Sequence, residues 1–474
     1  MKKTFWYECI SCGKKYEATK NITYCRNCGS PLIIRYPNDA TFDKSRSKSI
    51  KDSIWRYWNL LPLHNERNIV SLGEGWTHLL KASRLSSYLG VKNLYLKNET
   101  TNPTGSFIDR GVSVAVSFAK EAGYKGTFCI TKGNLGVSLA AYSAKAGLKA
   151  TIFINRNIEI GKLYQIIAYG ADVNIITEGK FTNTDFKNKD IFNLNAENPF
   201  IIEGKKTTIF EILEQMNWAK VDKIIVPFGS GGHIYAIWKG INELKERNVI
   251  GPMKVQIFGI KPKSCESSDN KKSIAIDLCI PSTKLSKFAL NAIKETNGDL
   301  IYVSDEEILQ SMMLLAHMEG IFAEPSAAIT IAGLQHLLKK GLIEEDETIV
   351  SIITGFGLKN PRAIRILSPK PRKINRLIRN LDPSYGIRTM GRTKLEIMNI
   401  LNEKTMDYGY GIWKKLIKKG INLTLPAIYQ HLNELEKLEL ITKVVSFDES
   451  TQKKKVFYKL TRRGLNLLRE LYIR

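Results

Sequence analysis

The chain has 474 residues, of which 43% are hydrophobic, 25% are charged and only 15 are prolines. This composition excludes collagen-like, disordered and small disulfide-stapled proteins, and the length allows about three domains. The net charge of +25 is uneven, because residues 359–474 hold 26 Lys and Arg against 10 Asp and Glu. Such an excess favours an anionic partner for the C-terminal part, nucleic acid first, although solvated helix faces of a lysine-rich protein would also produce it.

Cysteine usage and hydropathy indicate the compartment. Seven cysteines, four of them within the first 28 residues, are too few and too clustered for a disulfide framework. No apolar run reaches the roughly 18 residues of a membrane span. The N-terminal MKKTFWYEC meets Glu8 and Cys9 before any apolar signal segment forms. We therefore expect a cytoplasmic protein with reduced cysteines and no membrane partner.

Residues 1–36 contain two CxxC pairs, Cys9 with Cys12 and Cys25 with Cys28. Each CxxC turn presents two thiolates to one metal, and four thiolates complete a tetrahedral zinc site. A unit this short cannot fold on core burial alone, so metal binding would supply the folding energy. The doubled spacing predicts a structural zinc ribbon; four ordinary reduced cysteines or a redox pair are the alternatives.

Residues 37–70 are predicted to be a linker or arm, and residues 71–358 alternate between strand-like and helix-like segments. This alternation predicts an α/β fold with parallel sheets. Helices are expected at 136–146 and 234–247. Strands are expected at 94–96, 127–131, 150–154, 173–176, 223–227, 255–260 and 349–353.

A basic, proline-rich linker is predicted over residues 359–384, followed by a separate unit over residues 385–474. That last unit shows a helix–helix–helix–strand–strand–helix order. Its helices are expected at 393–401, 412–419, 427–439 and 463–472, and its strands at 441–448 and 454–460.

The central unit carries a series of motifs in a fixed order. The motifs are SLGEGWTHL (71–79), LYLKNETTNPTGSFID (94–109), GNLGVSLAAYSAKAG (133–147), IIVPFGSGG (224–232), VSDEEI (303–308), EGIFAEPSAAITIAG (319–333) and TGFGLKNP (354–361). With these motifs, residues 1–361 resemble threonine synthases, which are pyridoxal-phosphate (PLP) enzymes that convert phosphohomoserine into threonine. The resemblance implies a fold-type-II, tryptophan-synthase-β-like body of two subdomains with a ligand cleft between them.

A phosphate site is predicted where a glycine-rich loop follows a strand and opens a helix, since backbone N–H groups at a helix N-terminus suit a phosphate. A tight strand–helix turn is the structural alternative. The loop residues are Gly229, Ser230, Gly231 and Gly232. By resemblance, Asn134 would meet the cofactor's ring oxygen and Thr354 its pyridine nitrogen.

One departure from the family concerns the chemistry directly. The family loop reads PTGSFKDRG and its lysine forms the Schiff base with PLP, whereas this chain has Ile108 in that place. Isoleucine has no lone pair and no proton to give, and loss of proton transfer alone costs about 10²–10⁴ in rate. A single-base change or a sequencing error would give the same residue. Lys132 is the candidate for a relocated amine, but it also suits an anionic ligand or a plain surface position.

Further departures surround the same pocket. The family reads LNSxNPxRxEGQKT, where Ser and Arg help hold the substrate phosphate, and this chain reads NAENPFIIEGKKTT from Asn195 onward. Ala196 and Ile201 therefore replace a hydroxyl and a guanidinium. His233 stands near the phosphate loop and is expected to be a helix-start residue rather than a catalyst. Several losses around one pocket indicate relaxed or redirected selection on chemistry.

The last 85 residues or so resemble the winged-helix domains of PadR-type transcription regulators, through YGYGI (408–412), IYQHLNELE (428–436) and LTRRG (460–464). Thr424 is a predicted N-cap and Ile428, Leu432, Leu435 and Leu438 a buried stripe. DNA contact is expected from the early residues of this helix and from the wing, unless the unit serves only for dimerisation. The candidate residues are Ala427, Gln430, His431, Lys453, Lys454 and Lys455.

These observations predict a pseudoenzyme regulator with no catalytic residues of its own. Its body would sense a small ligand (non-covalent PLP, threonine or a related amino acid), and its winged helix would bind double-stranded operator DNA, as a homodimer. The alternative is an active PLP-dependent threonine synthase or related lyase that uses another amine such as Lys132. A third possibility is a non-catalytic subunit that pairs with an active paralogue.

Overall fold

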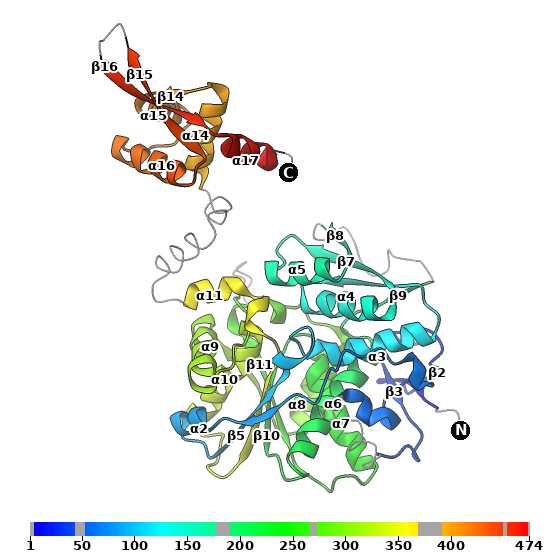
Figure 1. The fold of residues 1–474 in the computed structure, drawn as a ribbon. Helices are drawn as coiled ribbons and strands as arrows, with labels where there is room; N and C mark the ends of the chain where they lie inside the picture. The colour runs from blue at the N-terminus through cyan, green and yellow to red at the C-terminus, as the bar shows by residue number, and fades with distance from the viewer. Residues whose placement is uncertain are drawn as a thin grey trace. The chain divides into compact units, whose positions relative to one another are not determined.

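The computed structural model describes residues 4–42, 53–176, 190–265, 273–367, 391–448 and 453–472. The chain divides into two compact units, Met1–Leu367 and Ser368–Arg474, which are described separately (Figure 1). From residue 368 to residue 384, the predicted basic linker lies outside the described residues. Within the described ranges, no helix is long and apolar enough to cross a membrane.

The first unit begins with a small antiparallel sheet in the order β2-β1-β3. Its strands are β1 (Trp6–Cys9), β2 (Lys15–Glu17) and β3 (Leu32–Arg35). Within the predicted linker or arm, residues 54–63 pack into the core: Trp55 and Tyr57 in the 3-10 helix η1 (Ile54–Leu60) are buried. Their aromatic side chains supply more apolar area than a solvated linker would carry.

Two further sheets form the body of this unit, and all seven predicted strands lie in them. Both sheets are parallel except for the edge strand β4, as expected for strands joined by helical crossovers. The six-stranded sheet runs β12 (Leu300–Val303), β11 (Gln256–Pro262), β10 (Lys223–Pro227), β13 (Thr348–Ile353), β5 (Asn93–Asn98) and β4 (Leu79–Lys81). The four-stranded sheet runs β8 (Asp172–Ile176), β7 (Lys149–Asn155), β6 (Gly126–Thr131) and β9 (Ile191–Asn193).

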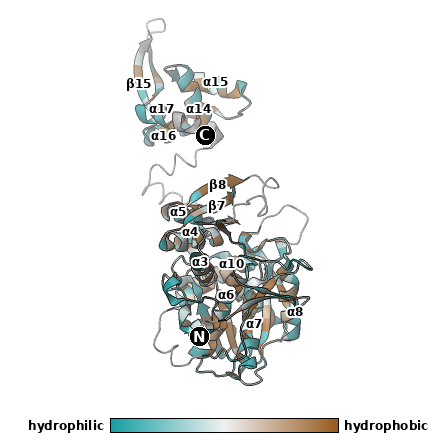
Figure 2. Cartoon of the chain, turned by 90° about the vertical axis from the view of Figure 1, so that its right-hand side faces the viewer, coloured by the Kyte–Doolittle hydropathy of each residue, from teal (hydrophilic) through white to brown (hydrophobic). Residues whose placement is uncertain are grey.

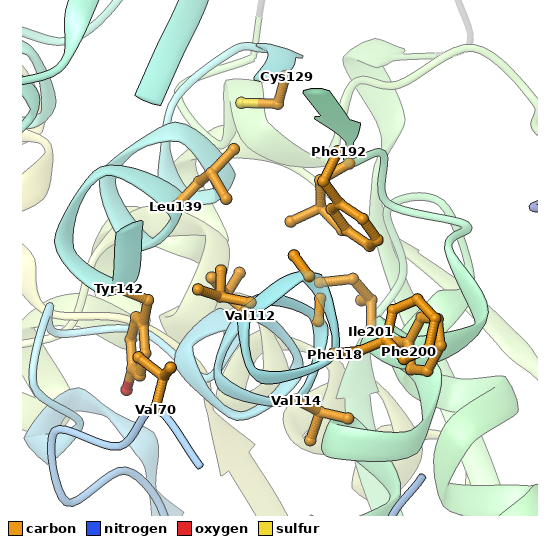
Figure 3. Packing of buried hydrophobic residues seen from close by; sticks show 14 of the residues in the cluster. Val70, Val112, Val114, Phe118, Cys129, Leu139, Tyr142, Phe192, Phe200 and Ile201 are labelled. Carbon is orange, nitrogen blue, oxygen red and sulfur yellow. The ribbon is translucent and has the colours of Figure 1, made fainter. Parts of the chain in front are cut away.

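Helices cover these sheets and enclose the core. Figure 2 shows hydrophobic segments inside the first unit and hydrophilic residues on outer helices such as α8. Figure 3 shows one cluster, to which Val112 of α3 and Ile201 of α6 belong and in which Phe118 of α3 stacks on Phe200 of α6, with ring centroids 4.0 Å apart. The helices are α2 (Ser83–Leu89), α3 (Ile108–Glu121), α4 (Asn134–Ala146), α5 (Ile160–Ala168), α6 (Pro199–Gln215), α7 (Gly232–Glu246), α8 (Lys284–Glu295), α9 (Asp305–Glu319), α10 (Pro325–Lys339) and α11 (Pro361–Leu367).

The second unit is a winged helix with its own core. Ile428, Leu432 and Leu435 are fully buried and Leu438 is partly buried, so the predicted stripe faces inward. Thr424 occupies the N-cap position of α16, but its side chain makes no capping hydrogen bond. The elements are α14 (Arg392–Glu403), β14 (Asp407–Tyr408), α15 (Gly409–Lys418), α16 (Leu425–Lys437), β15 (Ile441–Asp448), β16 (Lys453–Leu460) and α17 (Arg462–Tyr472), with the strands antiparallel in the order β14-β16-β15.

Candidate functional site

A cavity of about 370 Å³ lies where β6, β10 and β13 end and where α3, α4 and α7 begin. Carboxyl ends of parallel strands and the helix starts that follow them are the usual place for ligands in α/β proteins. The cavity collects residues that are far apart in the chain. Ten of the residues predicted around the pocket line it: Ile108, Lys132, Asn134, Ala196, Gly229, Ser230, Gly231, Gly232, His233 and Thr354.

The glycine-rich loop forms one wall of this cavity. Gly231 has φ 81°, and a Cβ there would lie 2.5 Å from the Cβ of Ala289, so this position requires glycine. The loop leads directly into α7, and among the described residues no acceptor is found for the backbone N–H groups of Gly229, Ser230 and Gly231. Free N–H groups at the start of a helix of this length suit an anion such as a phosphate.

A second wall carries charge around Asn134. Its amide Nδ2 donates to Glu324 Oε1 at 2.9 Å, whereas its Oδ1 is buried without a partner. Lys162 lies beneath this wall, where it pairs with Asp277 and lies 3.6 Å from Glu324. A Cβ on Gly133 would lie 2.4 Å from Lys162 Cδ, so the glycine leaves room for the Lys162 side chain to pack against this loop.

The loop that holds Ile108 is braced by buried polar contacts. Asp109 accepts hydrogen bonds from the backbone N–H of Thr104 and from the Thr104 and Ser138 hydroxyls, at 2.6–2.7 Å. Arg110 is fully buried and binds Glu99 and Glu211. This bracing keeps residue 108 at the cavity wall, although its side chain is a hydrocarbon.

The structure separates two of the substituted positions. Ala196 lines the cavity, whereas Ile201 is fully buried in the apolar cluster of Figure 3 and does not line it. His233 is buried, stacks on Phe107 at 4.4 Å and keeps one ring nitrogen, Nδ1, without a partner. Burial lowers the pKa of His233 well below its usual value, and the nearby Lys205 lowers it further, so the imidazole is neutral.

Lys205 is a cavity residue that the sequence reasoning missed. It lies on α6, lines the cavity and is 3% exposed. A signal was present, because the chain reads EGKKT where the related motif has EGQKT. By contrast, Lys132 is exposed and its Nζ donates to the carbonyl oxygen of Cys279 at 2.7 Å.

Cys279 also corrects the prediction that all cysteines are reduced, because it forms a disulfide with Cys265. The two cysteines are only 14 residues apart, and Asp277 and Leu278, which directly precede Cys279, line the cavity. Tertiary structure brings their Cα atoms to 5.0 Å, a separation that cysteine counting does not reveal.

The four N-terminal cysteines form a cluster in which all Sγ atoms lie within 4.8 Å of one another. The Sγ atoms of Cys9 and Cys28 are 3.3 Å apart and those of Cys12 and Cys25 are 3.7 Å apart. Thiolates bound to one zinc ion at about 2.3 Å have comparable separations, so the donor set fits a closed tetrahedral site.

The cysteine-bearing unit touches a wall of the cavity. Asn21 Nδ2 donates to the carbonyl oxygen of Asn193 at 2.6 Å, and Asn198 Nδ2 donates to Asn21 Oδ1 at 2.9 Å. The Tyr24 hydroxyl donates to Glu197 Oε2 at 2.5 Å. These bonds hold the segment that carries Ala196 in the cavity wall.

In the second unit, α16 presents the predicted DNA-contacting residues unequally. Gln430 is exposed, and its side chain makes no hydrogen bond in the described part of the chain, whereas Ala427 is half-buried. His431 is half-buried with an enclosed Nδ1, and burial together with the charge of Lys394 lowers its pKa. In the wing, Lys455 pairs with Ser446 across the strands, while the side chains of Lys453 and Lys454 lie outside what is described.

Fold and cavity define the class of protein, and comparison with family models agrees: residues 70–355 match the pyridoxal-phosphate dependent enzyme family, and the chain belongs to it. Residues 397–470 match the transcriptional regulator PadR-like family. Threonine synthase of Methanocaldococcus jannaschii is 41% identical over 77% of this chain and 96% of its own length. Threonine synthase of Methanosarcina acetivorans is 36% identical over 77% of this chain and 94% of its own length.

Solved structures agree on the fold. The structure of maize serine racemase matches with a TM-score of 0.53 and 22% identity, covering 65% of this chain and 93% of its own. Threonine deaminase isoform 2 of Solanum lycopersicum matches with a TM-score of 0.51 and 21% identity, covering 62% of this chain and 83% of its own. The chain is therefore a threonine-synthase-like, fold-type-II PLP body joined to a PadR-like winged helix.

The cavity has groups that fit PLP. The free N–H groups of the 229–232 loop suit its phosphate, and the unpartnered oxygen of Asn134 and the buried Thr354 are polar groups for its ring. When bound, PLP supplies an electron sink for carbanion chemistry at an amino acid. Ile108 contributes neither a covalent link nor a proton.

Proposed function

We propose that this protein is a ligand-responsive transcription regulator whose PLP-type body has lost the catalytic lysine of threonine synthases. The observation that carries the proposal is Ile108, which lines an otherwise well-formed cavity at the place of that lysine. PLP held by Asn134, Gly229–Gly232 and Thr354, or threonine or a related amino acid, is the proposed ligand. The winged helix binds operator DNA through Ala427, Gln430, His431 and Lys453–Lys455, in a cytoplasmic homodimer with zinc in its four-cysteine site.

The test is binding of the full-length chain to its own promoter and to promoters of threonine-pathway genes, followed by footprinting. We expect a protected, near-palindromic site and a change in its affinity of about 5–150-fold when PLP or threonine is added, which corresponds to a coupling of about 1–3 kcal/mol. Salt-sensitive binding that ignores sequence, or an affinity unaffected by these ligands, would contradict the proposal.

A second candidate function is a PLP-dependent lyase that uses another amine. The threonine synthases that are 36–41% identical favour it, as do the two lysines in the cavity wall. Release of phosphate and threonine from phosphohomoserine by the PLP-loaded protein would support it. In that case the Ile108→Lys variant is the positive control, because it restores the family's loop.

A further inference from the structure

Lys205 is a buried amine whose surroundings provide no counter-charge. No hydrogen bond or ion pair is found for its Nζ within the described ranges, and the contact recorded is with the ring of Phe107, 5.1 Å from Nζ to the centroid. The other lysines in and around the cavity are engaged. Lys132 binds a carbonyl oxygen, Lys162 pairs with Asp277, and Lys359 donates to the carbonyl oxygen of Thr104 at 2.6 Å.

The packing of two helices brings Lys205 beside the position of the missing lysine. A Cβ on Gly204 would lie 2.0 Å from the carbonyl oxygen of Arg110, and a Cβ on Gly111 would lie 2.7 Å from that of Ile201. Because glycines at these positions let α6 press against α3, residue 205 lies against the first turn of α3. Ile108, in that turn, and Lys205 line the same cavity.

The environment also suits nucleophilic chemistry. Burial lowers the pKa of Lys205 to about 8, so a useful fraction of the amine is neutral near pH 7. Burial is the cause of this shift and no acidic group opposes it, so no anion holds Lys205 as an ammonium ion. The nearby His233 is neutral and has a ring nitrogen without a partner. A buried lysine with a lowered pKa is the form used for Schiff-base formation in proteins.

We propose that Lys205 takes the place of the missing lysine and condenses with the aldehyde of PLP to form an imine. The Nζ lone pair forms a bond to the aldehyde carbon, the two amine protons pass to the carbonyl oxygen, and that oxygen leaves as water. No oxidant or reductant is required. The inference deepens the proposed function, since it rests on PLP as the ligand of this cavity and makes that ligand covalent and reversible.

The test is borohydride trapping of the full-length protein with equimolar PLP. Borohydride delivers a hydride to the imine carbon and leaves a stable secondary amine, which peptide mass spectrometry locates. We expect one adduct per chain on Lys205, with an imine absorption band before reduction. Lys205→Arg keeps the positive charge but forms no trapped adduct, Lys205→Gln restores the family residue and also forms none, and Lys132→Arg keeps the adduct at full yield.

Two outcomes would overturn the proposal: a principal adduct on Lys132 or another lysine, or no stoichiometric adduct in the unmodified protein. Mapping in the unmodified protein does not depend on the folding of any variant. Pyridoxine phosphate, which lacks the aldehyde, measures non-covalent binding separately. If pyridoxine phosphate binds and shifts operator affinity while PLP forms no adduct, the imine proposal fails and the regulator proposal stands. If PLP forms an adduct on Lys205 but the protein binds no specific DNA, the imine proposal stands and the regulator proposal fails.

Discussion

The ion-pair network around Arg110 and the cavity lie next to each other, and they differ in whether their buried polar groups have partners. Around Arg110, every charge has a partner: the guanidinium binds Glu99 at 2.7 Å and Glu211 at 2.5 Å, and Lys97 donates to Glu211 at 2.8 Å. In the cavity, by contrast, Oδ1 of Asn134 and Nδ1 of His233 are buried without a partner. The amine of the buried Lys205 has no hydrogen bond or ion pair among the described residues.

A network with all partners present stabilises the fold, whereas polar groups without partners are available to a ligand. Burial alone would raise the pKa of Glu211, but the charges of Arg110 and Lys97 outweigh it and lower that pKa to about 2, so the network is fully ionised and satisfied. Burying polar groups without partners costs stability, and proteins keep such groups where a ligand completes them. The groups without partners in the cavity therefore support the proposal that it binds a ligand, although Ile108 stands at the place of the family's lysine.

The largest expected effect comes from the cysteine cluster. Removing zinc with a strong chelator should unfold the ribbon, because metal binding in such units supplies about 10–16 kcal/mol. The contacts from Asn21 and Tyr24 to residues 193–198 would then be lost, and PLP affinity, measured by fluorescence titration, should fall about tenfold. Tyr24→Phe, which leaves the metal ligands intact, is the control and should cost less. Unchanged PLP affinity in the metal-free protein would show that the ribbon does not support the cavity.

Breaking the satisfied network comes next. Arg110→Ala should lower the free energy of unfolding by about 3–5 kcal/mol, because Glu99 and Glu211 would be left buried and uncompensated. Urea denaturation measures this loss. Lys92→Ala removes an exposed ion pair with Glu345 and should cost less than about 1 kcal/mol. Equal losses in the two variants would refute the contrast between buried and exposed pairs.

Removing the amine of Lys205 should raise the stability of the protein, the opposite of removing the Arg110 guanidinium. Its pKa falls from 10.5 to about 8 on folding, so the unfolded chain binds more protons between those pH values and unfolding free energy rises with pH there. Lys205→Met removes this dependence and should stabilise the protein by about 3 kcal/mol at pH 7. Denaturation curves at pH 7 and pH 9 measure both effects.

The neighbouring lysine is the matched control for that prediction. Lys206 is equally buried but pairs with Glu203 and, at 2.7 Å, with Glu243. Lys206→Met should therefore destabilise the protein at both pH values. If both methionine variants lose stability, Lys205 has a partner and the unsatisfied cavity is not a ligand site.

The smallest expected effect lies in the second unit, where the same contrast holds. Lys415 pairs with Asp407, whereas the side chain of Gln430 has no hydrogen bond within the described residues. Gln430→Ala should weaken specific operator binding by about 1–3 kcal/mol and leave thermal stability unchanged. Fluorescence anisotropy with operator and scrambled DNA measures it, with Asn402→Ala, an exposed change on α14, as control. Equal weakening on both DNAs would mean that Gln430 does not read bases.

Much of the architecture was predictable from local patterns. Strand and helix periodicity placed the seven predicted strands and the helices α4 and α7, because burial of one face imposes that periodicity wherever an element packs. Ordered motifs identified the PLP-type body and the PadR-like unit. The cavity residues Asn134, Gly229–Gly232 and Thr354 followed from the same motifs, since a phosphate loop needs glycine at fixed positions.

What local patterns could not supply was which side chains meet and which are left without a partner. Lys205 and Lys206 are adjacent and identical in type, yet Lys205 lines a cavity, whereas Lys206 pairs with two carboxylates. The reason is that helix α6 turns successive residues in different directions. Ile201 points into the core, and the tertiary structure brings Cys265 within disulfide distance of Cys279. Composition and spacing set the elements and the family; the packing of α3 against α6 determined which amine lies beside Ile108, because only long-range contacts create or withhold a partner charge.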